Sequence, residues 1–378
     1  MRCLVISPVP TWPINQGNAA NITRVNQLLQ AAGFDIHFVY SALEGVTSGA
    51  ATAMARQWEQ LDIIPHCGVR ETSGPRGIPL DSWFDPTVAD HVAQLCARSR
   101  YDLVLVHYVW MSAVCDVVPE DCPVWLYTHD RFGDRHLMLA RAGISPEWFS
   151  VSVSEESRGL ARADLLLATQ EAEADYFRSH VRRPVHVLGS LQTLLQRPIG
   201  RISRKAALIA GYIGSANPGN RHSLQQLLRA IDEGSMADPN RFCLVLAGPI
   251  GDSEQFARPY VHALGSINRL DELYRQVDIM LNPSVGGSGL KIKTVEFLAA
   301  GMPLVSTTDG MMGLESTHPA LACADGATVA AMLPGLVNAE ERDILAQACR
   351  NSIATYMKAQ SAALTRLLST LPAFAKLQ

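Results

Sequence analysis

Short apolar segments alternate with helix-like segments along all 378 residues, and this alternation limits the possible folds more than any other feature. The apolar segments predict buried strands, and a parallel sheet with helices on both faces is the arrangement in which strands are apolar throughout. The predicted strands are 2–9, 35–40, 61–65, 102–107, 124–128, 163–168 and 184–188, followed by 206–214, 242–248, 260–265, 277–281 and 303–307.

The pattern pauses at a polar, basic connector, 196–205, and then starts again. We therefore predict two Rossmann-like, doubly wound α/β domains that face a cleft, 1–195 and 205–354. The last helix-like segment, 340–368, is long enough to cross back, so that about 355–378 joins the first domain. With 48% hydrophobic residues the chain can build two cores. Ligands of such sheets bind at the carboxyl ends of the strands.

Composition disfavours several classes of protein. A net charge of −4, with no basic run longer than a pair, predicts no nucleic-acid partner and at most weak peripheral membrane association. The eight cysteines form no CxxC motif and predict reduced thiols rather than disulfides or zinc ligands. The apolar stretch 3–6 is too short for a signal peptide, so we expect a cytoplasmic protein or one at the inner face of the membrane.

A glycine-rich stretch, 283–306, follows the predicted strand 277–281 and leads into a helix that closes at Gly301. Glycines permit a positive φ and close ligand approach, and a helix N-terminus offers unpaired N–H groups and a positive dipole end. An anion, most simply a phosphate, suits this place. The candidate binding residues in the stretch are Gly287, Ser288, Gly289, Leu290, Lys291, Lys293 and Glu296.

The charges on this helix sharpen the hypothesis. Lys291 and Lys293 lie at its start, where cations are unfavourable unless an anion offsets them. Glu296, one turn later, can face a cleft and accept hydrogen bonds from the hydroxyls of a ribose. The alternative is a solvated pair between Lys293 and Glu296, with glycines that only form a turn.

The chain resembles GT-B glycosyltransferases, specifically the retaining enzymes of glycosyltransferase family 4. The resemblance covers nearly the whole chain and is most specific over 277–306, preceded by Leu264-Gly-Ser-Ile. It implies a nucleotide-sugar donor site in the second domain, with Glu296 on the ribose and the glycine loop on the diphosphate. The family often has an additional glutamate that holds the donor sugar, and here Ser288 occupies that position.

Two further loops follow predicted strands. Gly214 ends the first strand of the second domain, and Arg221 after it is a candidate to balance a leaving diphosphate; the alternative is a surface arginine near a helix start. We expect the helix after this loop to run from Ser223 to Ile231, and Asn220 is a candidate neighbour of its cap. In the first domain, Gly17 and Asn18 resemble the family's glycine loop beside the diphosphate and the acceptor.

His129 and Asp130 come directly after the predicted strand 124–128 and are the candidate catalytic residues. His129 resembles the family's histidine that touches the transferred sugar. Asp130 orients His129, contacts an acceptor hydroxyl or caps the next segment. Residues 107–110 follow another strand end, as acceptor lining or as core. Glu155 and Glu156 read as a solvated face.

These features predict transfer of a hexosyl-type group from a nucleoside-diphosphate sugar to a glycan, a lipid-linked sugar or a small molecule. No Asp-x-Asp motif occurs, so we expect neither metal nor cofactor. The loop 11–19 lacks His, Asp and Glu, which favours retention; inversion with Asp130 or His129 as base stays open. The alternatives are an epimerase on the same fold and a catalytically silent sugar-nucleotide-binding protein.

Overall fold

The structure is a computed structural model that describes residues 1–378 except 15, 68–76, 147, 195–206, 268 and 372–378. The predicted connector 196–205, the first residue of the predicted strand 206–214 and the last residues of the segment 355–378 lie outside the described residues.

All twelve predicted strands are present, and each begins and ends within two residues of its predicted limits. They are β1 (Arg2–Ser7), β2 (Asp35–Ala42), β3 (Gln60–Pro65), β4 (Leu103–His107), β5 (Val124–Tyr127), β6 (Leu165–Ala168), β7 (Val185–Val187), β8 (Leu208–Ile213), β9 (Phe242–Ala247), β10 (Val261–Gly265), β11 (Ile279–Asn282) and β12 (Leu304–Ser306). They form a seven-stranded sheet in the order β3-β2-β1-β4-β5-β6-β7 and a five-stranded sheet in the order β10-β9-β8-β11-β12.

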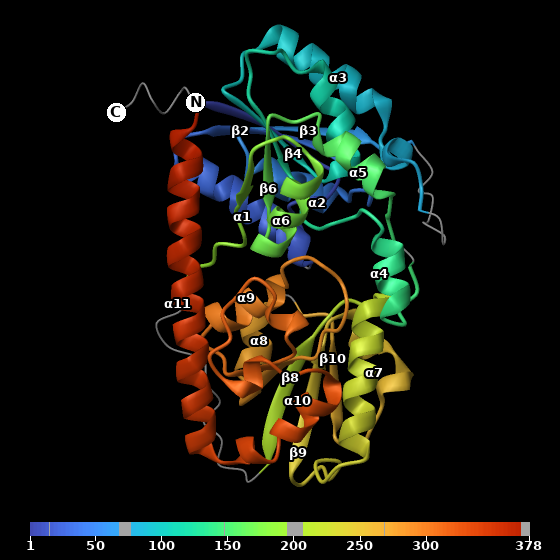
Figure 1. Ribbon diagram of the computed structural model, residues 1–378, viewed down its shortest axis with the longest axis vertical. Helices are drawn as coiled ribbons and strands as arrows, with labels where there is room; N and C mark the ends of the chain where they lie inside the picture. Colours follow the sequence, from blue (N-terminus) through green and yellow to red (C-terminus); the bar gives the residue numbers. More distant parts are fainter. Residues whose placement is uncertain (15, 68–76, 147, 195–206, 268, 372–378) are drawn as a thin grey trace.

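Every strand pairing in both sheets is parallel. The described α-helices are α1 (Gly17–Ala31), α2 (Ser48–Ala55), α3 (Pro86–Arg98), α4 (Arg135–Arg141), α5 (Val153–Leu160), α6 (Glu171–His180), α7 (Pro218–Asp232), α8 (Leu270–Tyr274), α9 (Ile292–Ala299), α10 (Gly326–Met332) and α11 (Ala339–Ser369). In the upper half of Figure 1, α3 and α5 lie on one side of the sheet and α1 and α6 on the other. The predicted α/β fold is therefore confirmed.

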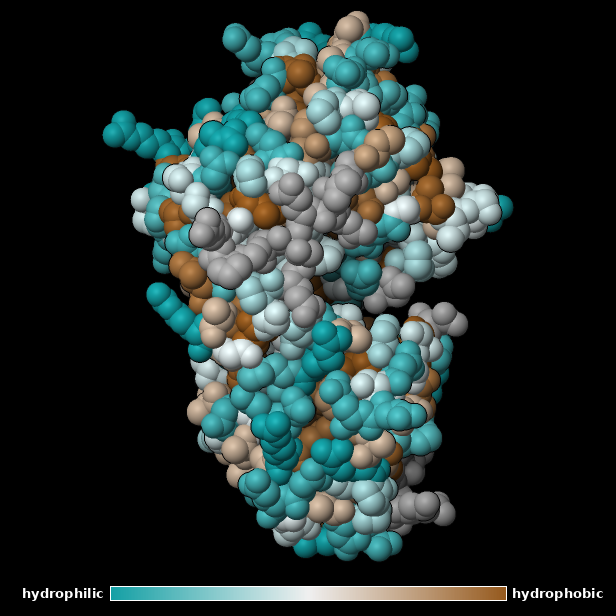
Figure 2. Space-filling model, turned by 90° about the vertical axis from the view of Figure 1, so that its right-hand side faces the viewer, coloured by the Kyte–Doolittle hydropathy of each residue, from teal (hydrophilic) through white to brown (hydrophobic). Residues whose placement is uncertain are grey.

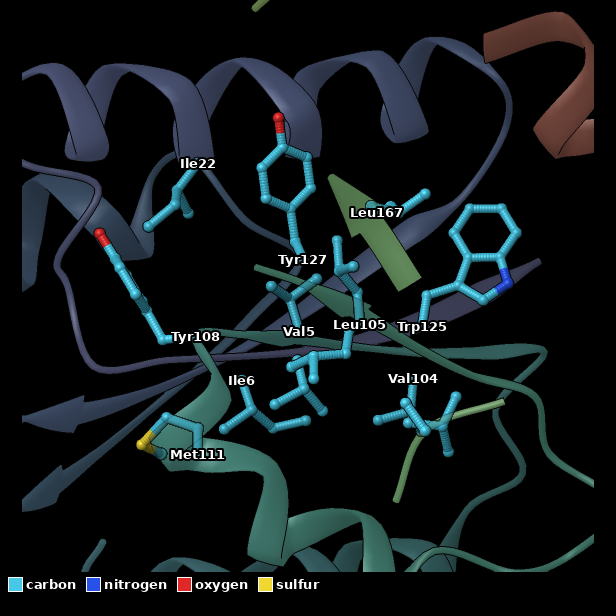
Figure 3. Packing of buried hydrophobic residues seen from close by; sticks show 14 of the residues in the cluster. Val5, Ile6, Ile22, Val104, Leu105, Tyr108, Met111, Trp125, Tyr127 and Leu167 are labelled. Atoms are coloured by element: carbon cyan, nitrogen blue, oxygen red, sulfur yellow. The ribbon is translucent and has the colours of Figure 1, made fainter. Parts of the chain in front are cut away.

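Buried apolar residues form one core around each sheet. Figure 3 shows Val5, Leu105 and Tyr127 on the sheet side that faces Ile22 of α1. The buried Tyr127 hydroxyl donates to the Leu188 carbonyl oxygen (2.6 Å) and accepts from the Asn21 side chain (3.0 Å), which satisfies a polar group that burial would otherwise penalise.

The helix α11 runs along both halves of the molecule (Figure 1), as the predicted crossing requires. Its side chains Leu345, Ile353 and Tyr356 belong to the second core, whereas Leu367 belongs to the first. Between them, the Gln360 side-chain oxygen accepts a hydrogen bond from the Gly189 N–H (2.7 Å). One continuous helix thus contributes to both cores.

Candidate active site

The glycine loop between β11 and α9 is shaped by positive backbone angles. Gly286 and Gly287 have φ of +72° and +88°, a backbone conformation that residues with a side chain rarely adopt. A Cβ at Gly289 would lie 3.1 Å from the His129 carbonyl oxygen and 3.2 Å from an Asp130 carboxylate oxygen. The loop therefore approaches the first domain too closely for larger residues.

Hydrogen bonds of Ser288 and Leu290 join this loop to the first domain. The Ser288 hydroxyl donates to the Asp130 carboxylate, the Gln170 side chain donates to the Ser288 carbonyl oxygen (3.1 Å), and the Leu290 N–H donates to the Thr169 hydroxyl (3.4 Å). Asp130 also forms an ion pair with Arg135 (3.3 Å). The Asp130 carboxylate thus lies against the position where the resemblance implied a glutamate.

The two lysines at the start of α9 lie in different surroundings. Lys291 is the N-cap residue and its ammonium donates to the Gly289 carbonyl oxygen (2.9 Å). The Lys293 ammonium lies 4.7 Å from the centre of the Tyr212 ring and donates to the Asn220 side-chain oxygen (3.4 Å). Among the described residues neither lysine forms an ion pair with a carboxylate, so the alternative interpretation, a Lys293–Glu296 pair, is not what the structure shows.

The surroundings of both lysines lower their pKa. Burial is the larger cause in each case; for Lys293, the nearby positive charge of Lys291 adds to it and brings the pKa to about 7. Asp130 and Glu173 act in the opposite direction on the pKa of Lys291. An anion at the start of α9 would stabilise the charged form of both groups, because no side chain caps this helix and its first turn holds no acidic residue.

Glu296 is half-buried on α9, and its carboxylate makes no hydrogen bond or ion pair with another described side chain. Burial raises the pKa of this carboxyl group to about 7. The Tyr274 hydroxyl nearby is buried and likewise has no partner among the described residues. A ligand with hydroxyl groups would satisfy a carboxylate placed this way.

The loop after β8 differs from the prediction at its end. The helix α7 begins at Pro218 rather than at residue 223, because the Asn217 side chain accepts from the Asn220 N–H (2.8 Å) and so forms the cap. Asn220 lies within the first turn, and its side chain donates to the Ser215 carbonyl oxygen (3.0 Å). The Arg221 guanidinium donates to the Ala216 carbonyl oxygen.

Asn220 connects this loop to α9. A Cβ at Gly214 would lie 3.2 Å from the Asn220 side-chain nitrogen, and the oxygen of the same side chain accepts from Lys293. Gly214, Asn220 and Lys293 are therefore neighbours, and Arg221 lies in the same helical turn as Asn220.

His129 has a φ of +64° and stacks on Tyr108, whose ring centre is 4.2 Å away. Its Nε2 atom lies 2.8 Å from Nδ1 of the fully buried His107. Burial lowers the pKa of His107 to about 3, and burial together with His107 lowers the pKa of His129 well below its usual value. Both rings are therefore neutral near pH 7, and Nδ1 of His129 is the nitrogen that the pair leaves for a ligand.

Gly17 and Asn18 open α1 beside the same group of residues. A Cβ at Gly17 would lie 3.2 Å from the Ile292 Cβ of α9. The Asn18 side chain accepts from the Ala19 N–H (2.8 Å) and hydrogen-bonds to Tyr108, the residue that stacks on His129. The structure thus brings the predicted residues of both domains to the start of α9.

Two buried glutamates were not predicted. Glu156, expected on a solvated face, is 1% exposed; its carboxylate accepts from the Phe132 N–H (2.6 Å) and the Tyr176 hydroxyl (2.8 Å), and burial raises its pKa to about 7. Glu173 accepts from Thr169, and burial, followed by Asp130, raises its pKa to about 8. Glu173 follows β6 at the same edge of the sheet as His129, and this position in the sequence could have identified it as a candidate site residue.

The molecular surface is hollowed between the upper and lower halves on the face shown in Figure 2.

No group of three His, Cys, Asp or Glu residues with the geometry of a metal site occurs in the part of the chain that the structure describes. None of the helices formed by the described residues has the length and apolar character needed to cross a membrane.

Two parallel-sheet domains, with a glycine loop and a basic helix start facing a histidine loop, define the class of GT-B glycosyltransferases. Residues 8–189 match the family described as Glycosyltransferase Family 4, and residues 207–350 match Glycosyl transferases group 1. The chain therefore belongs to the glycosyltransferases that combine these two domains, Glycosyltransferase Family 4 and Glycosyl transferases group 1. No curated protein matches the sequence.

Solved structures share the fold at low sequence identity. Anabaena HepE in complex with UDP and glucose is 13% identical, with a TM-score of 0.67 over 96% of this chain and 99% of that one. A Rickettsia africae glycosyltransferase is 12% identical, with a TM-score of 0.65 over 100% and 99%. The apo lipopolysaccharide outer core galactosyltransferase WaaB is 11% identical, with a TM-score of 0.60 over 97% and 99%.

Proposed function

We propose that this glycosyltransferase moves a hexosyl-type group from a nucleoside-diphosphate sugar to a saccharide, lipid-linked or small-molecule acceptor. The observation that carries the proposal is the pair Lys291 and Lys293 at an uncapped helix start, where no carboxylate of the described residues forms an ion pair with either lysine. A diphosphate at this point would meet two cations, a helix dipole and the glycine loop. Glu296 would then hold the ribose hydroxyls.

The proposed transfer uses protein cations rather than a metal to stabilise the departing diphosphate. Lys291, Lys293 and Arg221 are the candidate cations, and Gly17, Asn18 and Gly214 leave room for the phosphates. Neutral His129 would contact the transferred sugar through Nδ1, and Asp130, held by Ser288 and Arg135, would lie beside it.

Retention is the proposed stereochemical course. The loop 11–19 offers no carboxylate or histidine as a base, so the leaving phosphate would accept the proton of the acceptor hydroxyl. Inversion with Asp130 as base is the second candidate, because this carboxylate lies beside the glycine loop.

Thermal unfolding with nucleotides tests the donor site. HepE was solved with UDP and UDP-glucose, so UDP and UDP-sugars are the first probes, followed by GDP, ADP, CMP and dTDP. A ligand at roughly 100 times its Kd stabilises a protein by about 2.7 kcal/mol. We expect such a gain with one nucleotide, unchanged by EDTA and lost in Glu296→Ala. Unchanged melting with every nucleotide would refute the donor site.

Turnover separates the enzyme from the alternatives. A His129→Ala variant should lose transfer while it keeps nucleotide stabilisation, because His129 lies in the other domain from the lysines. A wild-type protein that binds the nucleotide sugar without releasing nucleoside diphosphate is a silent binding protein. Conversion of the sugar in a bound nucleotide sugar without acceptor identifies an epimerase.

A further inference from the structure

A buried carboxylate lies against the loop 128–134, which joins β5 to α4. It belongs to Glu156 of α5, whose side chain accepts from the Phe132 N–H (2.6 Å) and from the Tyr176 hydroxyl (2.8 Å). The Gly133 N–H is a third donor to the same carboxylate. Because Glu156 is only 1% exposed, these three donors take the place that water has around a carboxylate on the surface.

The contacts around Gly133 leave no room for a larger residue. A Cβ at Gly133 would overlap both the Tyr176 hydroxyl and the Glu156 carboxylate. The Arg131 guanidinium lies 3.8 Å from the centre of the Tyr176 ring, and its Nε donates to the Gly133 carbonyl oxygen (3.1 Å). The middle of the loop is therefore held by α5, by α6 and by its own arginine.

Two routes connect this carboxylate to His129. Along the backbone, Phe132 follows His129 by three residues in the same loop. Through the side chains, the centre of the Phe132 ring lies 5.0 Å from that of Trp110. Trp110 stacks on Tyr108 (4.3 Å), and Tyr108 stacks on His129 (4.2 Å). Close-packed side chains transmit displacements, so a shift of the Phe132 backbone moves the His129 ring.

The chemistry of Glu156 suits more than the filling of space. An apolar residue or an amide would be buried here at lower cost than an ionised carboxylate. A carboxylate, however, accepts from three donors at once, whereas protonation or a change to glutamine turns one acceptor position into a donor. Burial raises the pKa of Glu156 to about 7. Among the described residues, the titratable and charged side chains that act on this pKa are Tyr176 of α6 and Arg131 of the loop.

We propose that Glu156 is a positioning residue of the transfer reaction: its ionised carboxylate sets the loop that brings His129 and Asp130 to the transferred sugar, and its protonation releases this loop. The inference rests on the proposed function and adds a residue that acts through His129 without contact to a substrate.

This role makes stability and activity change in opposite directions with pH. The pKa of Glu156 is raised above its usual 4.5, so the stability that this group contributes is fully present below about pH 4.5 and is lost as the pH rises through 7. Activity requires the ionised form and therefore falls as the pH falls through 7. A residue with a structural role alone would make activity follow stability.

Histidine NMR tests the positioning without turnover. The protein is labelled with ¹⁵N-histidine, and His129→Ala assigns the His129 signal. Burial and the neighbouring His107 lower the pKa of His129 well below its usual value, so a change of its signal near pH 7 reports a neighbour and not its own proton. We expect a step with a midpoint of about pH 7 in the wild type and no such step in Glu156→Gln.

The variant Tyr176→Phe assigns this step to Glu156. It keeps the ring beside Arg131 and removes one donor to the carboxylate, so the midpoint should rise by roughly half to one pH unit. Tyr260→Phe is the matched control, because the Tyr260 hydroxyl donates to a carboxylate of the second domain, that of Asp232 (2.6 Å). A wild-type signal that stays constant from about pH 6 to 8, or a midpoint that Tyr176→Phe leaves unchanged, would overturn the inference.

Turnover separates this inference from the proposed function. With saturating nucleotide sugar, kcat of the wild type should fall below about pH 7, and Glu156→Gln should lower kcat about a hundredfold, as a misplacement of about 1 Å does. Nucleotide stabilisation of Glu156→Gln should equal that of the wild type, since α9 lies in the other domain. Transfer with an unchanged kcat in Glu156→Gln would refute the positioning role. A protein without transfer whose His129 step still moves in Tyr176→Phe would refute the proposed function alone.

Discussion

Glu296 is the residue whose ionisation and function oppose each other. Its folded-state pKa is about 7 against a usual 4.5, so protonation favours the folded protein. The corresponding stability is fully present below about pH 4.5 and is lost as the pH rises through 7. A charged Glu296 is nevertheless what a ribose requires, so the site keeps a group that destabilises the protein without its ligand.

Replacement of Glu296 by glutamine removes this cost. We expect Glu296→Gln to be more stable than the wild type by on the order of 1–2 kcal/mol at about pH 8 and equal to it at about pH 4, with the value reduced because the side chain is partly exposed. Urea denaturation at both pH values measures the difference. Glu272→Gln, at an exposed position, is the control; a pH-independent effect of Glu296→Gln would contradict the burial argument.

The buried polar residues show why sequence predicted only part of the site. His129, Lys291 and Glu296 were identified because they follow strand ends or begin a helix. Glu156 was assigned to solvent, yet its partners are the Phe132 N–H and the Tyr176 hydroxyl. Such partners lie far apart in the chain, so no local pattern announces them.

At the scale of elements, the glycine loop depends on room as well as on φ. A Cβ at Gly286 would lie 2.9 Å from the Ala142 Cβ and 3.2 Å from the Ile144 Cδ1, in the other domain. We expect Gly286→Ala to lower the free energy of unfolding by about 2 kcal/mol or more. The loss combines the strain of a positive φ with the displacement of the side chains that the new Cβ would meet.

Gly33→Ala isolates the strain. Its φ is +91°, but the nearest group to an added Cβ is the Met1 methyl at 3.8 Å, an ordinary contact. This control should lose only about 1 kcal/mol. Guanidinium denaturation of both variants gives the comparison, and equal losses would show that the loop does not approach Ala142 in solution.

Strands were predicted more accurately than helix starts, for a physical reason. Most strands are buried on both faces and therefore largely apolar, as in β4, whose five residues are all buried, whereas the edge strands β3 and β10 are only partly buried. The start of α7 depended instead on one capping contact, from Asn217, and Asn-Pro-Gly also suits a turn. Local chemistry permitted both conformations, and packing of α7 on the second sheet selected the helix.

At the scale of the whole molecule, α11 joins the two cores. Its early apolar side chains pack with the second sheet and its late ones with the first. Gly189 lies where the helix passes from one to the other, and a Cβ there would overlap the Tyr356 hydroxyl. The sequence predicted the crossing from helix length, whereas the contact point depended on a glycine far away in the chain.

The Gln360 side chain makes a polar contact at this crossing, and we expect its loss to lower the stability of both cores. Gln360→Leu leaves the buried Gly189 N–H without its acceptor, which costs about 1–3 kcal/mol. Gln347→Leu, exposed on the same helix, should change stability by less than about 0.5 kcal/mol. Urea unfolding followed by circular dichroism measures both variants. A helix that joins two cores transmits the loss of one contact to both, so we expect Gln360→Leu to shift a single unfolding transition to a lower urea concentration. Two separate transitions, or equal stability of the two variants, would contradict this coupling.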